Sequence, residues 1–146
     1  MSMTNAAEYA FLDLLFLNVD WPNIGDAAGL QNSAAAGSFF VTLHSADPGE
    51  AGNQSTNEIA YTGYGRVSVN RTAGGFTRTG STVANTALVQ FPQATGGTAT
   101  ATHFGIGTDS TGAGNLLLKG ALNASLSISN GIQPQFAAGA LTATVD

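Results

Sequence analysis

Apolar residues recur at helical spacing only near the start of the chain. The apolar positions of this stretch are Phe11, Leu12, Leu14, Leu15 and Phe16. Their spacing predicts an amphipathic helix. Asn5 can cap this helix, and Glu8, three residues later, can complete a capping box. We expect the helix to end at Trp21, because a residue before a proline avoids the helical conformation.

From residue 38 onward the pattern changes to an alternation of apolar and polar residues, interrupted by turn residues. Candidate strands cover residues 39–43, 61–71, 76–78, 83–91, 98–107, 116–118, 122–129, 132–136 and 141–145. In residues 122–129 the apolar and polar side chains alternate most clearly, as in an antiparallel strand with one face in water. Short strands at such spacing are typical of sandwiches and barrels. We therefore expect an all-β fold, an antiparallel β-sandwich or jelly roll of about eight short strands, with a short N-terminal α-helix.

The length of 146 residues is that of one ordinary domain. Residues 24–37 are rich in Gly, Ala, Asn and Ser, and we interpret them as a loop. We therefore divide the chain into an N-terminal helix and loop arm, residues 1–37, and a β-domain, residues 38–146. The helix either docks on its own domain or packs on a neighbouring subunit.

Charged residues make up only 9% of the chain, against about 25% in typical soluble domains. Four basic residues and a net charge of −5 cannot build a phosphate-neutralising patch, so we do not expect nucleic-acid binding. The apolar N-terminal stretch is too short to span a bilayer, and no Lys or Arg precedes Arg66 to form a signal peptide. Cysteine is absent, which excludes disulfides and thiolate chemistry. Sparse charge favours a protein that works within an assembly.

Candidate chemistry rests on two histidines. His44 lies close to Asp47 and could act as a base, but Ser45 is not in a nucleophile elbow. A metal held by His44 and His103 would need a third ligand such as Asp47 or Asp109, and no spacing enforces one. We therefore expect no catalytic residues, no metal and no cofactor.

Structural roles explain these residues more simply. If the strands of His44 and His103 are neighbours, the two imidazoles could share a hydrogen-bond network. Arg66, in a chain with so few cations, is expected to pair with Asp47 or Glu50.

Several short segments occur in a specific order after the apolar helix. They are VTLHSADPG (41–49), YGRV (64–67), ATHFGIG (101–107), GAG (112–114), KGAL (119–122), GIQPQF (131–136) and AGAL (138–141). In this order they resemble small virion proteins of tailed bacteriophages, from about residue 4 onward. Members of that group are labelled tail-fibre-like or head-decoration proteins. The resemblance supplies no catalytic residues.

We therefore predict a capsid decoration, or cement, protein on the outer surface of a phage head. It would bridge subunits of the major capsid protein as a homo-oligomer, with a dimer favoured over a trimer. The candidate interface residues are Phe11, Leu12, Leu15, Phe16 and Trp21, although Trp21 could equally pack on its own domain. The alternative is a tail-fibre or tail-associated module that binds a host receptor or glycan, with a stacking platform formed by Tyr61, Tyr64 and Phe76.

Overall fold

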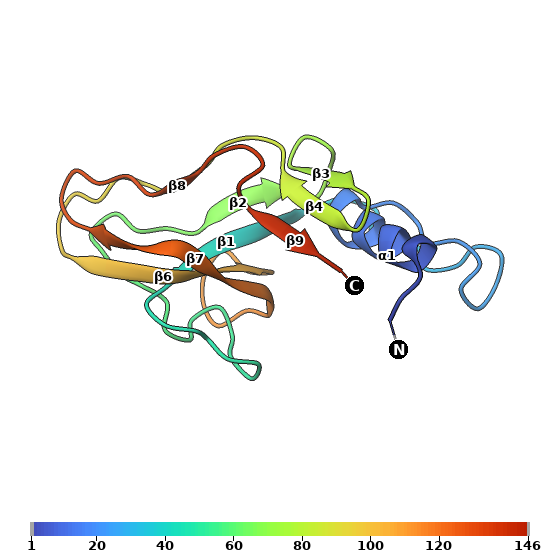
Figure 1. Ribbon diagram of the computed structural model, residues 1–146, viewed down its shortest axis with the longest axis horizontal. Helices are drawn as coiled ribbons and strands as arrows, with labels where there is room; N and C mark the ends of the chain where they lie inside the picture. The colour runs from blue at the N-terminus through green and yellow to red at the C-terminus, as the bar shows by residue number, and fades with distance from the viewer. Residues whose placement is uncertain (1, 146) are drawn as a thin grey trace. The chain divides into compact units, whose positions relative to one another are not determined.

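A computed structural model describes residues 2–145 of the chain (Figure 1). Within these residues it contains one α-helix, α1 (Asn5–Leu12), followed by a π-helical turn, η1 (Asp13–Leu17). The strands are β1 (Ser38–His44), β2 (Val67–Asn70), β3 (Phe76–Thr79), β4 (Thr82–Asn85), β5 (Val89–Gln90), β6 (Ala99–Gly107), β7 (Leu116–Ile128), β8 (Gln135–Phe136) and β9 (Thr142–Thr144). The predicted fold class is confirmed: the protein is an all-β sandwich of antiparallel strands with one short N-terminal helix.

The chain forms two compact units, each assembled from separate segments. Among the described residues, 2–38, 70–88 and 136–145 form the first, which we call the helix unit. Residues 39–69 and 89–135 form the second, the sheet unit. The structure thus groups the chain differently from the predicted division at residue 37, because the N-terminal helix packs with segments from the middle and the end of the chain.

In the helix unit, α1 and η1 pack beside a three-stranded sheet of order β3-β4-β9. Leu12 and Phe16, four residues apart on one helical face, are both almost fully buried. The ring of Phe16 meets that of Phe76 edge-on, with centroids 4.9 Å apart. This aromatic pair fixes the helix on the first strand of the sheet.

The ends of the helix differ from the prediction. Thr4 is the N-cap, and Asn5 is already the first helical residue. The helical turns end at Leu17, because Asn18 adopts a left-handed conformation with φ of 57°. Asn tolerates this conformation better than most residues, so the chain leaves the helix before it reaches Trp21.

The main sheet of the sheet unit has the order β2-β1-β6-β7. β1 pairs with β6 from Phe40 opposite Gly107 to His44 opposite His103. β1 is buried on both faces, because Thr42 and His44 are as inaccessible as Val41 and Leu43. A fully covered central strand explains why this segment is a nearly continuous apolar run.

Some strand boundaries were predicted wrongly. Residues 83–91 divide into β4 and β5, which belong to different sheets. The two segments at 116–118 and 122–129 merge into the single strand β7. β3 pairs with β4 through a turn at Gly80, where φ is 60°.

Candidate functional site

The largest group of exposed apolar side chains lies in the helix unit, on α1 and the loop after η1. We call residues 18–33 the finger; it forms the blue loop beyond the helix in Figure 1. Seven large apolar side chains are exposed among the described residues. Four of them lie here: Phe11 (38% exposed), Val19 (49%), Ile24 (43%) and Leu30 (45%). Because these four side chains lie within residues 11–30, this segment is our candidate for an interaction surface.

The finger is held in one conformation by its own hydrogen bonds. Trp21 and Leu30 exchange both backbone bonds, each 2.9 Å long. At the base of the finger, the Asn18 side chain donates to the Ser33 carbonyl and accepts from the Ser33 amide. The Asp20 carboxylate accepts from the Asn32 amide. The Asp26 carboxylate accepts from the amides of Ala28 and Gly29. Both carboxylates of the finger therefore bind its own backbone, and its apolar side chains are presented on an ordered loop.

The structure separates the five predicted interface residues into two groups. Leu12 and Phe16 are core residues of the helix unit, because the helical repeat turns them toward Phe76. They cannot form an outer surface. Phe11 is exposed, whereas Leu15 and Trp21 are half-buried.

Two arginines fix the helix within its unit. Arg78 forms a bidentate ion pair with Asp13, with N–O distances of 2.5 and 3.1 Å, and its guanidinium carbon lies 4.8 Å from the ring centre of Tyr9. Arg71 donates hydrogen bonds to the carbonyls of Leu14 (2.8 Å) and Leu15 (2.6 Å), which belong to the last helical turn. Positive charge at a helix C-terminus satisfies carbonyls that lack helical partners.

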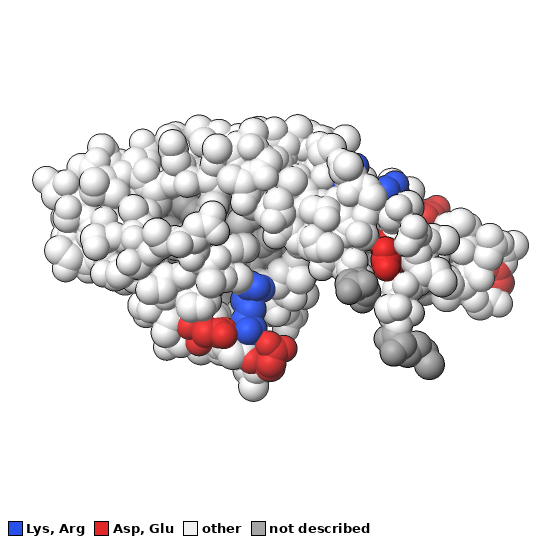
Figure 2. Space-filling view, viewed as in Figure 1, with Lys and Arg blue, Asp and Glu red and all other residues white. Residues whose placement is uncertain are grey.

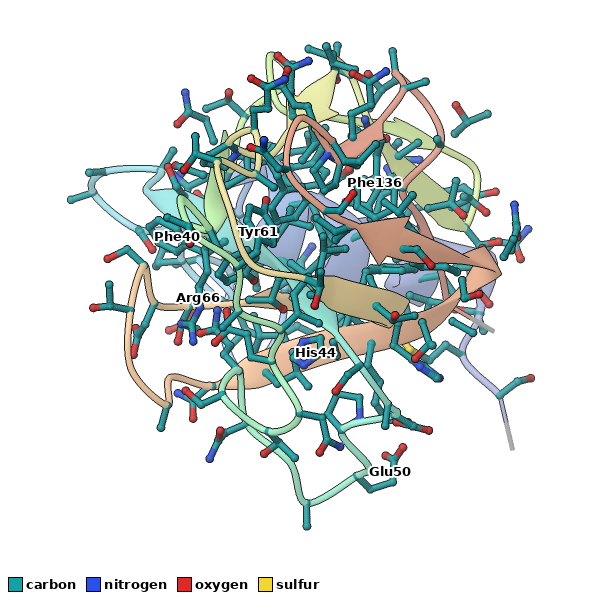
Figure 3. All side chains as sticks on the ribbon, turned by 90° about the vertical axis from the view of Figure 1, so that its left-hand side faces the viewer. Phe40, His44, Glu50, Tyr61, Arg66 and Phe136 are labelled. Carbon is teal, nitrogen blue, oxygen red and sulfur yellow. The ribbon has the colours of Figure 1, made fainter. Side chains whose placement is uncertain are left out.

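In the sheet unit, Arg66, which is labelled in Figure 3, forms a nearly buried ion pair with Glu58. The side chain of Arg66 is 4% exposed and that of Glu58 is 15% exposed. Arg66 Nε and Nη2 bind the two carboxylate oxygens at 2.8 and 2.7 Å, and the Tyr64 hydroxyl donates to the same carboxylate at 2.9 Å. The prediction that Arg66 pairs with Asp47 or Glu50 is therefore wrong: Glu58 is its partner, and it raises the pKa of Arg66.

The same guanidinium holds the loop between β6 and β7. Arg66 donates to the carbonyls of Asp109 (2.8 Å) and Gly112 (2.6 Å). Gln54, which is fully buried, binds the same loop from the other side. Its amide nitrogen donates to the Asp109 carbonyl, and its amide oxygen accepts from the Asp109 amide. We call Gln54, Glu58, Tyr64 and Arg66 the Arg66 cluster; its role in the described structure is to lock the loops 52–58 and 108–115 together.

Gln54, which lies in the mainly polar segment 51–58, was not identified from the sequence. Gly107 and Gly114 make room for this side chain, since a Cβ at either position would overlap Gln54 atoms. Only these two glycines, one at the end of β6 and one in the loop before β7, could have indicated such close packing.

His44 has a structural role. The Thr56 carbonyl can only accept, so His44 Nδ1 carries the proton of that 2.8 Å bond. Nε2 is then the acceptor for the Thr42 hydroxyl at 2.7 Å. Burial lowers the pKa of His44 and keeps the ring neutral. The predicted neighbouring strands are confirmed by the His44–His103 register, but His103 binds the hydroxyl of Thr102, so no hydrogen bond joins the two imidazoles.

Asp47 does not orient His44. Its carboxylate lies 3.1 Å from Lys119, which also binds Glu50 at 3.0 Å. The backbone amide of Gly49 and the ammonium of Lys119 lower the pKa of Asp47. These groups form an exposed ion-pair cluster, which contributes little to stability.

The proposed aromatic stacking platform is absent from the described structure. Tyr61 and Phe76 are buried, in the sheet unit and the helix unit respectively. Tyr64 is half-buried and stacks on Phe91, with ring centroids 6.2 Å apart. These rings stabilise their own units and offer no open face to a sugar.

The described residues contain no group of three or more His, Cys, Asp or Glu side chains that could hold a metal ion. Among residues 2–145, no helix has the length and apolar character needed to cross a membrane.

Comparison with known proteins agrees with the predicted relationship to virion proteins of tailed phages. Residues 2–144 match the family model Gp80, described as podophage GP4 fiber I protein gp80. The chain therefore belongs to the Gp80 family, and it is a structural protein of a phage particle. No curated protein matches the chain.

Proposed function

We propose that this chain is a fibre subunit of a podophage virion and that the finger, together with Phe11, attaches it to another virion protein. The observation that carries this proposal is the family match, which extends over residues 2–144 and so includes both units. The family description names a fibre protein, so the tail-fibre alternative of the sequence analysis becomes the leading function.

The distribution of charge supports a role in a permanent assembly. All four basic side chains have ion-pair or hydrogen-bond partners within the chain: Arg66 with Glu58, Arg71 with helix carbonyls, Arg78 with Asp13, and Lys119 with Asp47 and Glu50. The face shown in Figure 2 is mostly uncharged, with small groups in which red and blue atoms adjoin. Contacts of such a surface depend mainly on shape and apolar area and only weakly on salt.

The finger supports a protein partner for attachment. Its conformation is already fixed by the bonds of Trp21, Asp20 and Asp26, so little conformational entropy is lost on binding. The finger contains no basic residue, and its two carboxylates, Asp20 and Asp26, accept hydrogen bonds from its own backbone. Ile24, near the middle of the finger, is the side chain whose replacement by a charge should weaken attachment most directly.

Capsid decoration, with the major capsid protein as partner, is the competing function. The low charge of the chain and the same candidate surface are also consistent with this function. The two functions differ in where the chain lies on the particle. Antibody labelling of purified virions in the electron microscope separates the two functions. Gold at the tail or neck supports the fibre function, whereas gold distributed over the head overturns it.

The attachment surface has its own test. Virions are assembled with the Ile24→Asp chain and, as a control, with the Leu88→Asp chain, because Leu88 is an equally exposed side chain outside the finger. We expect Ile24→Asp to lower the number of copies per particle and Leu88→Asp to leave it unchanged. Equal incorporation of both variants would overturn the finger as the attachment surface while leaving the fibre function intact.

A further inference from the structure

β7 is the edge strand of the main sheet, with β6 on one side only. It is the longest strand among the described residues, with 13 residues from Leu116 to Ile128. Every second residue of an edge strand directs its backbone N–H and C=O away from the sheet. No other strand in the described part of the chain pairs with this outer side of β7.

Two irregularities limit where another strand could be added. In the first, Ala101 of β6 pairs with Leu126 of β7, whereas His103 pairs with Ala121. One residue of β6 therefore faces four residues of β7, 122–125, between these two pairs. A second register shift lies at Leu117, between Leu116 and Leu118. Between the two register shifts, β7 pairs regularly with consecutive residues of β6 over four positions, Leu118 to Ala121. These four residues form one regular stretch of the β7 edge.

Of the features that usually protect an edge, this stretch has one lysine and a register shift at each end. It contains no proline, and its single charge, Lys119, is compensated by Asp47 and Glu50. One face of this part of β7 is only half-buried, and it carries Leu118, Gly120 and Leu122. Ile106, the β6 partner of Leu118, is by contrast buried. An open hollow of about 350 Å³ borders residues 116–119 and is otherwise lined by Gly49, Glu50 and Gly52.

We infer that the outer edge of β7 pairs antiparallel with β7 of a second copy of this chain, with Gly120 on the two-fold axis. In a two-fold pairing the same strand is present on both sides, so each residue must be compatible with the residue of the same strand that lies opposite it. Around Gly120, Leu118 of one copy lies across from Leu122 of the other, which is the first residue of β7 beyond the regular stretch, and both leucines are half-buried. Lys119 lies across from Ala121, so like charges are not opposed.

Gly120 itself suits this position. A Cβ at residue 120 would come within 2.7 Å of two ring carbons of Phe104, so the Phe104 ring lies directly over Gly120. Phe104 is half-buried in the single chain. The cross-strand leucines of the second copy would extend the apolar layer beside this ring, which is the gain expected from burying apolar area at a new sheet junction. The inference concerns assembly of the chain with itself and does not depend on the proposed attachment to the virion.

The chain contains no cysteine, so introduced cysteines report the contact directly. The double variant Leu118→Cys/Leu122→Cys is oxidised gently, because directly opposed residues of antiparallel strands have the Cα separation that a disulfide needs. We expect a covalent dimer on a non-reducing gel. Leu88→Cys/Ile132→Cys, at two other exposed positions, is the control and is expected to remain uncrosslinked at the same protein concentration.

Sedimentation of the unmodified chain over a wide concentration range gives the second readout. We expect a monomer–dimer equilibrium that Ala121→Lys shifts to monomer, because it places a second positive charge opposite Lys119 of the other copy, and that Leu88→Lys leaves unchanged. A wild-type chain that stays monomeric at all concentrations overturns the inference. A dimer that Ala121→Lys does not weaken, or that Ile24→Asp dissociates instead, also overturns it, because the contact then lies elsewhere.

Discussion

His44 lies directly opposite His103 on the neighbouring antiparallel strands β1 and β6, yet each imidazole binds its own threonine. The His44 ring also binds the Thr56 carbonyl and is fully buried. It therefore connects the central strand to the loop 52–58. The two histidines of the motifs that resemble phage virion proteins have structural roles here.

Stability is predicted to fall as the pH is lowered below about 6.5, the ordinary pKa of histidine. Burial lowers the pKa of His44, so in this range the unfolded chain binds a proton that the folded chain does not. The free energy of unfolding should decrease by at most about 1.4 kcal/mol for each pH unit until the folded pKa is reached. Urea unfolding between pH 5 and 7, about the range in which histidine titrates, measures this slope.

The variant His44→Asn is the control for this pH effect. Its side-chain amide can still donate to the Thr56 carbonyl but cannot take up a proton. The pKa of Asp47 is lowered by the Gly49 amide and by Lys119, so this carboxyl group affects stability only at lower pH. A slope that survives in His44→Asn would show that another group causes it.

Arg66→Ala is predicted to destabilise the protein strongly. It leaves the nearly buried Glu58 carboxylate without its counter-ion and removes the bonds to the Asp109 and Gly112 carbonyls. Breaking a buried ion pair typically costs about 3–5 kcal/mol. Chemical denaturation gives the loss, with Lys119→Ala as the control at an exposed ion pair. Equal small losses for the two variants would contradict the structural role of the Arg66 cluster.

Gly105→Ala is predicted to disturb the environment of His44. A Cβ at residue 105 would lie 2.6 Å from Thr42 Oγ1 and 2.9 Å from His44 Nε2, both fully buried groups. Overpacking of this kind costs about 1–3 kcal/mol. Gly65→Ala, in the same unit, is the control, because its Cβ would meet nothing closer than 3.9 Å. Thermal unfolding that ranks Gly65→Ala below Gly105→Ala would refute this account of the packing.

Arg71→Met is predicted to loosen the helix without unfolding the sheet unit. The substitution keeps an unbranched side chain and removes the hydrogen bonds to the Leu14 and Leu15 carbonyls. Bonds from a charged donor contribute about 1.5–3 kcal/mol each, so local opening should increase roughly tenfold or more. Hydrogen exchange of residues 5–17 measures the effect, with β1 and β6 as the internal reference. Unchanged exchange in the helix would mean that Phe16 and Asp13 alone hold it in place.

The local pattern of apolar and polar residues predicted the two central strands of the main sheet. Residues 39–43 and 98–107 form central strands, and their β-branched, aromatic and apolar residues reflect burial on a sheet. Residues 83–91 were taken as one strand, because an apolar and polar alternation does not show where a chain passes from one sheet to another. The helix was likewise predicted, but its end depends on the left-handed Asn18, which sequence periodicity cannot reveal.

The partners of charged residues were harder to predict than the elements. Arg66 was assigned to Asp47 or Glu50, although Glu58 lies nearer in the sequence. Glu58 reaches Arg66 because loop 52–58 folds over β1 through the Thr56–His44 bond. The buried amide of Asn85 has the same character: it binds the carbonyls of Ala87 and Ala137 and accepts from the Leu141 amide. Such long-range polar contacts depend on tertiary folding, and no local pattern predicts them.

The most direct test of the account is the number of copies of this chain per virion, measured by quantitative mass spectrometry against the major capsid protein. A fibre subunit is confined to the few positions where fibres attach, so we predict a copy number far below that of the capsid protein. A copy number close to that of the capsid protein would contradict the fibre function and place the chain on the head as a decoration protein.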